Sequence, residues 1–246
     1  MNKALKPVEL FLAVGLAATM TACGGTPTTD SGEAEVDAAV AEAVAQPSES
    51  GEGGESAYSG DTFEDKLSGA ELLSALQAGG HVVFFRHAQT EKDYADQADP
   101  NLNVNDCSTQ RALSESGWQD ASLIGESFET LGITVGDVYS SQYCRAWQTA
   151  AIAFGKYEKL AELNFAPAEE YTDEQVTQMR AGIMPLLTAV PEAGTNTVVV
   201  GHDDVFESAT GIYPEPQGVA FVLKPDGQGS FEILASLVPN EWASLQ

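Results

Sequence analysis

The chain has 246 residues and carries 37 acidic against 11 basic side chains, which gives a formal net charge of −26 at pH 7. A surface this acidic repels nucleic acid and anionic lipid, so both are excluded as partners of the folded part. We interpret the charge as an adaptation for solubility or salt, and an acidic partner-binding surface is the less favoured alternative.

The N-terminal residues 1–22 have the features of an export signal. Two lysines precede an apolar stretch, residues 10–20, that is too short to span a bilayer. The sequence Ala22-Cys23-Gly24 follows and resembles the lipidation site of a bacterial lipoprotein. We therefore predict a lipid anchor on Cys23, with the protein facing the periplasm or the cell exterior. Secretion with cleavage after Ala22 is the alternative, and it would leave an exposed thiol.

Residues 23–61 are predicted to form a disordered acidic tether. They contain small, polar and acidic residues, no Lys or Arg, and almost no large apolar side chains. Such a composition does not bury enough apolar surface to offset the entropy lost on ordering. One folded domain is expected at residues 62–246, which is long enough to bury a core.

Helices and strands are predicted to alternate from residue 63 onward. Ser68, Ser114 and Thr172 are N-cap candidates, and short apolar runs indicate buried parallel strands. In chain order we expect a helix capped by Ser68 and reaching 76, a strand at 81–85, a helix from Ser114 to about 131, a strand at 137–140, a helix at 144–154, a strand at 161–165, a helix from Thr172 to about 189, a strand at 197–201, and a hairpin of 219–223 and 231–237. This alternation predicts an α/β fold of three layers, with a mainly parallel sheet, helices on both faces and a C-terminal antiparallel hairpin.

Histidine and arginine side chains follow three of the predicted strands. Arg86-His87 ends the first, Arg145 opens the helix after the second, and His202 follows the strand at 197–201. Ligands bind beyond the carboxyl ends of strands in such sheets, so we expect these residues to converge. Guanidinium groups bind phosphate oxygens, and an imidazole can attack phosphorus, which favours phosphoryl transfer. Each histidine alone is better explained as a structural residue, as we expect for His81.

Four segments in the same order resemble the motifs of the histidine phosphatase superfamily, the phosphoglycerate-mutase-like fold. They are residues 85–90 (Phe-Arg-His-Ala-Gln-Thr), 113–121, 140–150 and 199–202. The resemblance implies that His87 becomes phosphohistidine, that Arg86, Arg145 and His202 hold the phosphoryl oxygens, and that water hydrolyses the intermediate. It also implies that neither a metal nor another cofactor is needed. Gln142 departs from the pattern, since the family commonly has proline there.

Three neighbouring residues have open roles. Gln89 and Thr90 either bind phosphate as substrate-binding residues or cap the helix that follows. Arg111 either reaches the phosphate or forms a structural salt bridge.

The proton donor for the leaving group is the least defined residue. Asp203 directly follows His202, as in the branch of the family that uses a His-Asp pair, and we predict it as the donor. Glu169 or Glu170, in the loop after the third strand, are the main alternatives, and Glu162 is a further one.

Cys107 and Cys144 are left as a pair once Cys23 carries lipid. An exported compartment is oxidising, so we predict that they form a disulfide, with two buried free thiols as the alternative.

The sequence thus predicts an exported phosphomonoester hydrolase that acts on a small phosphorylated substrate and touches the membrane through its lipid anchor only. Residues 92–106 and 213–216 are expected to set specificity. A mutase or phosphotransferase is one alternative, and a non-catalytic envelope lipoprotein that binds phosphate or phospho-sugars is another. The sequence leaves the substrate, the oligomeric state and the choice of inner or outer membrane open.

Overall fold

The computed structural model describes residues 63–92, 96, 99–168 and 170–245. All of them belong to one compact unit, Ser56–Gln246. The predicted signal peptide, Cys23 and the tether lie outside the described residues. Within the described ranges, none of the helices combines the length and the apolar character that crossing a membrane requires.

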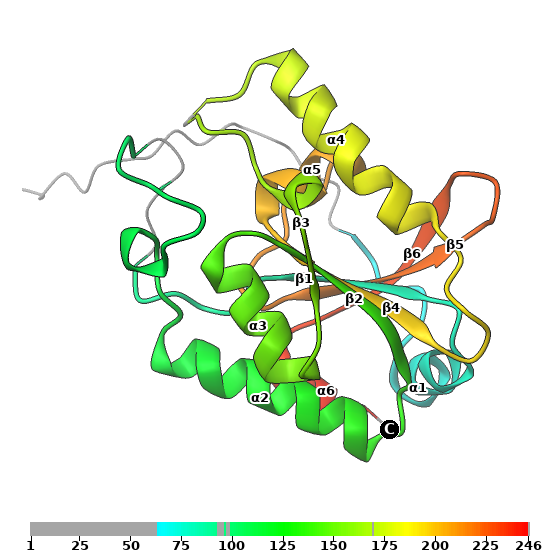
Figure 1. Ribbon diagram of the computed structural model, residues 1–246. Helices are drawn as coiled ribbons and strands as arrows, with labels where there is room; N and C mark the ends of the chain where they lie inside the picture. Colours follow the sequence, from blue (N-terminus) through cyan, green and yellow to red (C-terminus); the bar gives the residue numbers. More distant parts are fainter. Residues whose placement is uncertain (1–62, 93–95, 97–98, 169, 246) are drawn as a thin grey trace, which may run out of the picture. The chain divides into compact units, whose positions relative to one another are not determined.

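A six-stranded sheet forms the middle layer, in the order β3-β2-β4-β1-β5-β6 (Figure 1). The strands are β1 (Val82–Arg86), β2 (Val135–Ser141), β3 (Glu158–Leu160), β4 (Asn196–Gly201), β5 (Ala220–Pro225) and β6 (Phe231–Leu237). The four strands from β3 to β1 are mutually parallel, whereas β5 runs antiparallel to both β1 and β6. The predicted parallel sheet with a C-terminal hairpin at its edge is therefore confirmed.

Helices cover both faces of this sheet, as Figure 1 shows. One face carries α1, α2, α3 and α6, and the other carries α4 and α5. Their bounds are α1 Gly69–Ala78, α2 Glu115–Thr130, α3 Cys144–Phe154, α4 Asp173–Thr188, α5 Asp203–Thr210 and α6 Pro239–Trp242. The three-layer architecture follows from this arrangement.

Alternate side chains of the central strands enter the two opposite cores. In β1, Val83 and Phe85 pack with α1, α2, α3 and α6, whereas Val82 and Phe84 pack with α4 and α5. Because every residue of β1 is buried, its sequence is a continuous apolar run rather than an alternating one.

Two of the three predicted helix caps, Ser114 and Thr172, form their hydrogen bonds, whereas Ser68 precedes α1 without a side-chain cap hydrogen bond. The Ser114 hydroxyl accepts from the backbone N–H of Gly117. Thr172 and Gln175 form the reciprocal capping box of α4.

The predicted strand at 161–165 is wrong. The third strand is β3, three residues long, and residues 161–163 form a 3₁₀ helix, η2 (Ala161–Leu163). Glu158 and Lys159 in β3 are exposed, because β3 lies at the edge of the sheet and pairs with β2 alone. The sequence therefore has no apolar run to indicate it. The short helices α5 and α6 were not predicted either.

Candidate active site

The parallel register brings the predicted site residues together at the carboxyl ends of β1, β2 and β4. Arg86 lies opposite Gly201 in the β1–β4 pair, and Ser140 lies opposite Val200 in the β2–β4 pair. The His87 N–H donates to the Gly201 carbonyl at 3.0 Å. As a result, the imidazoles of His87 and His202 lie edge to face, with ring centroids 5.4 Å apart.

His87 is buried with a neutral imidazole and a defined tautomer. Its Nδ1 lies 2.9 Å from the Ala88 carbonyl, which only accepts, so Nδ1 carries the proton. Its Nε2 then holds the lone pair and accepts from Arg145 Nε at 3.2 Å. Burial lowers the pKa of His87 well below its ordinary value, and the charge of Arg145 lowers it further. The ring is therefore a neutral nucleophile, with Nε2 as the nitrogen able to attack.

Arg145 bridges the nucleophile and a buried carboxylate. Its two terminal nitrogens donate to the two oxygens of Asp96, at 3.0 and 3.1 Å. Arg145 and Asp96 are 3% and 2% exposed, so the pair is removed from water. The Arg111 backbone N–H adds a hydrogen bond to Asp96 at 3.1 Å. Asp96 thus occupies the bidentate position on Arg145 that a phosphate would take.

Arg86 is held by two carboxylates and an aromatic ring. Its terminal nitrogens lie 2.6 Å from Asp203 and 2.6 Å from Glu215, and one also donates to the Pro214 carbonyl. Tyr213 covers the guanidinium, with 5.4 Å to its ring centroid, and its hydroxyl donates to Asp203 at 2.8 Å. The Arg86 Nε is buried and has no hydrogen-bond partner among the described residues.

His202 has a tautomer set by Ser141. The Ser141 hydroxyl donates to Asn164 Oδ1 at 2.9 Å, so its oxygen accepts from His202 Nε2, also at 2.9 Å. The His202 Nδ1 is buried and lacks a hydrogen-bond partner in the described part of the chain. Burial lowers the pKa of His202 well below its ordinary value, and the charge of Arg145 lowers it further.

Gln89 and Thr90 have different roles in the structure. Gln89 contacts the start of α2, where its carbonyl accepts from the Ser114 N–H and its side-chain oxygen accepts from the Ser116 hydroxyl. The helix-capping interpretation therefore fits its contacts. The Thr90 hydroxyl donates to the Lys92 carbonyl and accepts from Arg111 Nη2 at 2.9 Å. Arg111 lies at the site, since its charge contributes to the lowered pKa values of His87 and His202.

The predicted disulfide is confirmed. Cys107 and Cys144 are bonded, with their Cα atoms 5.6 Å apart. The backbone N–H of Cys144 also donates to Gln110 Oε1 at 2.9 Å. These contacts fasten the segment before α2 to the first residue of α3, directly beside Arg145. By loop-closure entropy, a bridge that encloses this many residues stabilises the fold by about 3–4 kcal/mol.

The carboxylates considered as proton donors occupy different surroundings. Asp203 contacts Arg86, whereas Glu162 and Glu170 are exposed and Glu169 lies outside the described residues. Asp204, next to Asp203, accepts from the Tyr171 hydroxyl at 2.8 Å. Burial raises the pKa of Asp204 to about 6, and the charge of Asp203 adds to the effect.

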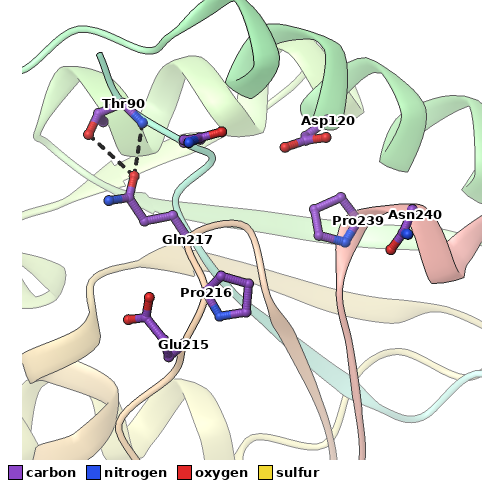
Figure 2. Close-up of a pocket in the computed structure, with 8 residues that line it drawn as sticks. Thr90, Asp120, Glu215, Pro216, Gln217, Pro239 and Asn240 are labelled. Atoms are coloured by element: carbon purple, nitrogen blue, oxygen red, sulfur yellow. Dashed lines mark hydrogen bonds between the residues drawn. The ribbon is translucent and has the colours of Figure 1, made fainter. Parts of the chain in front are cut away.

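A pocket of about 470 Å³ is lined by residues that contact the two arginines Arg86 and Arg111 (Figure 2). Thr90 and Glu215 lie along one side of it, and Asp120 and Asn240 lie along the other. The backbone N–H of Thr90 and its hydroxyl both contact Gln217 Oε1, at 2.8 and 3.3 Å. In the part of the chain that the structure describes, no three His, Cys, Asp or Glu side chains converge closely enough to hold a metal ion.

Asp96 was missed from the sequence as a site residue. It belongs to an acid-rich segment of an acidic chain, so its residue type carried no signal. Glu215 and Tyr213 lie in a segment that was expected to set specificity, but their contact with Arg86 was not foreseen.

A profile of the histidine phosphatase superfamily, branch 1, matches residues 82–195. A search among curated proteins found no match. Among solved structures, the protein histidine phosphatase SixA complexed with tungstate is 17% identical, with a TM-score of 0.48 over 65% of this chain and 98% of that chain. A mutant phosphoserine phosphatase from Entamoeba histolytica in complex with phosphoserine is 12% identical, with a TM-score of 0.47 over 63% of this chain and 95% of that chain.

Proposed function

Because this chain belongs to the histidine phosphatase superfamily, with the match over residues 82–195, we propose that it is a phosphomonoester hydrolase that acts through a phosphohistidine on His87. The observation that carries this proposal is the state of the His87 ring. It is neutral, its Nδ1 proton is committed to the Ala88 carbonyl, and its Nε2 lone pair adjoins a buried arginine.

The first step transfers the phosphoryl group to His87. Nε2 attacks phosphorus, the bond from phosphorus to the alcohol oxygen breaks, and the leaving oxygen takes a proton from an acid. Two buried groups lack hydrogen-bond partners among the described residues, Arg86 Nε and His202 Nδ1, and we assign both to the phosphoryl oxygens. The incoming dianion favours a proton on His202 Nδ1, which then donates to it.

The second step regenerates the enzyme. Water attacks the phosphorus of phosphohistidine and gives a proton to the carboxylate that the first step left ionised. The nitrogen–phosphorus bond breaks, and inorganic phosphate leaves with the neutral imidazole restored. A phosphotransferase would pass the phosphoryl group to a second alcohol instead of water. A binding protein would hold the phosphate without forming the bond to Nε2.

Hydrolysis of p-nitrophenyl phosphate by the purified protein tests the proposal. Release of inorganic phosphate in equal amount to p-nitrophenol supports a hydrolase. A phosphate yield that falls when an alcohol is added would favour a phosphotransferase. Phosphate binding without turnover would favour the envelope-binding alternative.

Asp203 is the proposed proton donor, because a donor must first be within reach of the reacting group and Asp203 contacts Arg86. We expect Asp203→Asn to lower kcat by roughly 10²–10⁴-fold on an alkyl phosphate, whose leaving group needs a proton. The loss on p-nitrophenyl phosphate should be much smaller. Asp204→Asn, the same change one residue along, is the matched control. If Asp204→Asn lowers kcat on the alkyl phosphate more than Asp203→Asn does, and spares p-nitrophenyl phosphate, Asp204 is the proton donor instead.

We also propose that the protein is exported and anchored through lipid on Cys23. Cys23→Ser should move the protein from the membrane pellet to the soluble fraction of cell lysates, because a cysteine thiol is the acceptor of the lipid. Immunoblots of the two fractions measure the change, and Thr21→Ser serves as a neighbouring control. If Cys23→Ser stays in the pellet, the anchor lies elsewhere.

A further inference from the structure

The pocket of Figure 2 is connected to the arginines of the proposed phosphate site. Glu215 lines the pocket and its carboxylate contacts Arg86 at 2.6 Å. Thr90 also lines it, and its hydroxyl accepts from Arg111. The volume of about 470 Å³ falls within the range of small-molecule sites. Two residues on one side of the pocket therefore contact Arg86 and Arg111.

The chain segments that line the pocket also pack against His87 and its neighbour Ala88. The Gly218 N–H, directly after Gln217 of the pocket, donates to the His87 carbonyl at 2.9 Å. On the opposite wall, Asp120 precedes Ala121, which packs in one cluster with Ala88. A phosphomonoester with its phosphoryl group at His87 thus has this pocket beside it for its alcohol portion.

The charged groups that line the pocket are all acidic. They are Asp120 and Glu215, and none of the lysines or arginines that the structure describes lines it. Asp120 has no hydrogen bond or ion pair with the described residues, and burial raises the pKa of its carboxyl group. A positively charged ligand group in the pocket would offset the cost of this partly buried carboxylate, whereas a second phosphate would be repelled.

The remaining walls suit a short carbon chain. Pro216 and Pro239 contribute apolar ring surfaces, and Gln217 and Asn240 contribute amide groups (Figure 2). The combination of apolar rings with a partly buried carboxylate fits methylene groups that end in an ammonium ion.

We propose that this pocket binds the leaving group of the substrate, and that the preferred substrates are phosphomonoesters of amino alcohols, with Asp120 as the residue that recognises the ammonium group. This inference rests on the proposed phosphatase function. It assigns Glu215 a secondary role, because that carboxylate already contacts Arg86.

The test compares O-phosphoethanolamine with propyl phosphate, which differ by the exchange of an ammonium for a methyl group. We expect kcat/KM of the full-length protein to favour phosphoethanolamine by about two- to fivefold, the range for a partly exposed ion pair. Asp120→Asn should bring the ratio toward one, and Asp120→Lys should invert it. Glu126→Gln, which removes an exposed charge from the same helix outside the pocket, should keep the wild-type ratio. A wild-type ratio of one, or a ratio that both Asp120 variants leave unchanged, overturns the inference.

Equilibrium binding separates this inference from the proposed function. If neither p-nitrophenyl phosphate nor any other phosphoester is hydrolysed, the phosphatase proposal fails. Calorimetric titration of the same two compounds into the full-length protein then decides the role of the pocket alone. Tighter binding of phosphoethanolamine that Asp120→Asn weakens supports the pocket assignment. Equal affinities reject it, even in a protein that hydrolyses p-nitrophenyl phosphate.

Discussion

His87→Ala is expected to abolish hydrolysis of p-nitrophenyl phosphate, with a loss in kcat of at least about 10⁴-fold. The reason is that Nε2 of this ring is the atom proposed to accept the phosphoryl group, and it is held beside Arg145 by a hydrogen bond. Stopped reactions of the wild-type protein with labelled substrate should yield a phosphoprotein that is labile to acid and stable to alkali. The same adduct should be missing in His87→Ala.

His81→Ala is the matched control for this experiment. His81 is also buried, and burial lowers its pKa as well, but it lies before the first residue of β1, at the opposite end of the strand from His87. Its replacement should leave activity per folded molecule near that of the wild type. Full activity in His87→Ala, or a phosphoryl adduct on another residue, would refute the mechanism.

Asp96→Ala is expected to lower the stability of the protein and to strengthen its binding of phosphate. Removal of the carboxylate leaves Arg145 buried without its counter-charge, which costs about 3–5 kcal/mol. Inorganic phosphate can then take the bidentate position on Arg145 and restore part of that stability. Denaturant unfolding with and without phosphate measures both effects, and the inhibition constant for phosphate should fall by about tenfold, which corresponds to 1.4 kcal/mol.

Asp99→Ala is the control for Asp96, because Asp99 lies in the same loop, is exposed, and its carboxylate accepts hydrogen bonds from Asn101 within its own turn. It should change neither stability nor phosphate affinity by a comparable amount. Weaker phosphate binding in Asp96→Ala would show that Asp96 orients Arg145 for the substrate rather than competing with it. Unchanged stability would show that the buried pair does not form in solution.

Local signals explain which parts of the fold were predictable. The hydroxyls of Ser114 and Thr172 satisfy backbone N–H groups at helix starts, and such caps depend on residues three positions apart. The buried runs of β1 and β4 are apolar because helices cover both faces of the sheet. β3 has no such signal, since its exposed residues are held only by pairing with β2.

The sequence by itself indicated the strands β1, β2 and β4, and therefore that Arg86, His87, Arg145 and His202 would meet at one edge of the sheet, because parallel strands have their carboxyl ends on the same side. It also predicted the Cys107–Cys144 disulfide, on the premise that Cys23 carries lipid, whereas the structure decided against two free thiols. Only the tertiary structure decided which carboxylates hold the two arginines. Asp96, Asp203 and Glu215 come from segments far apart in the chain, and among 37 acidic residues the contacts of these three arise from packing rather than from any local pattern.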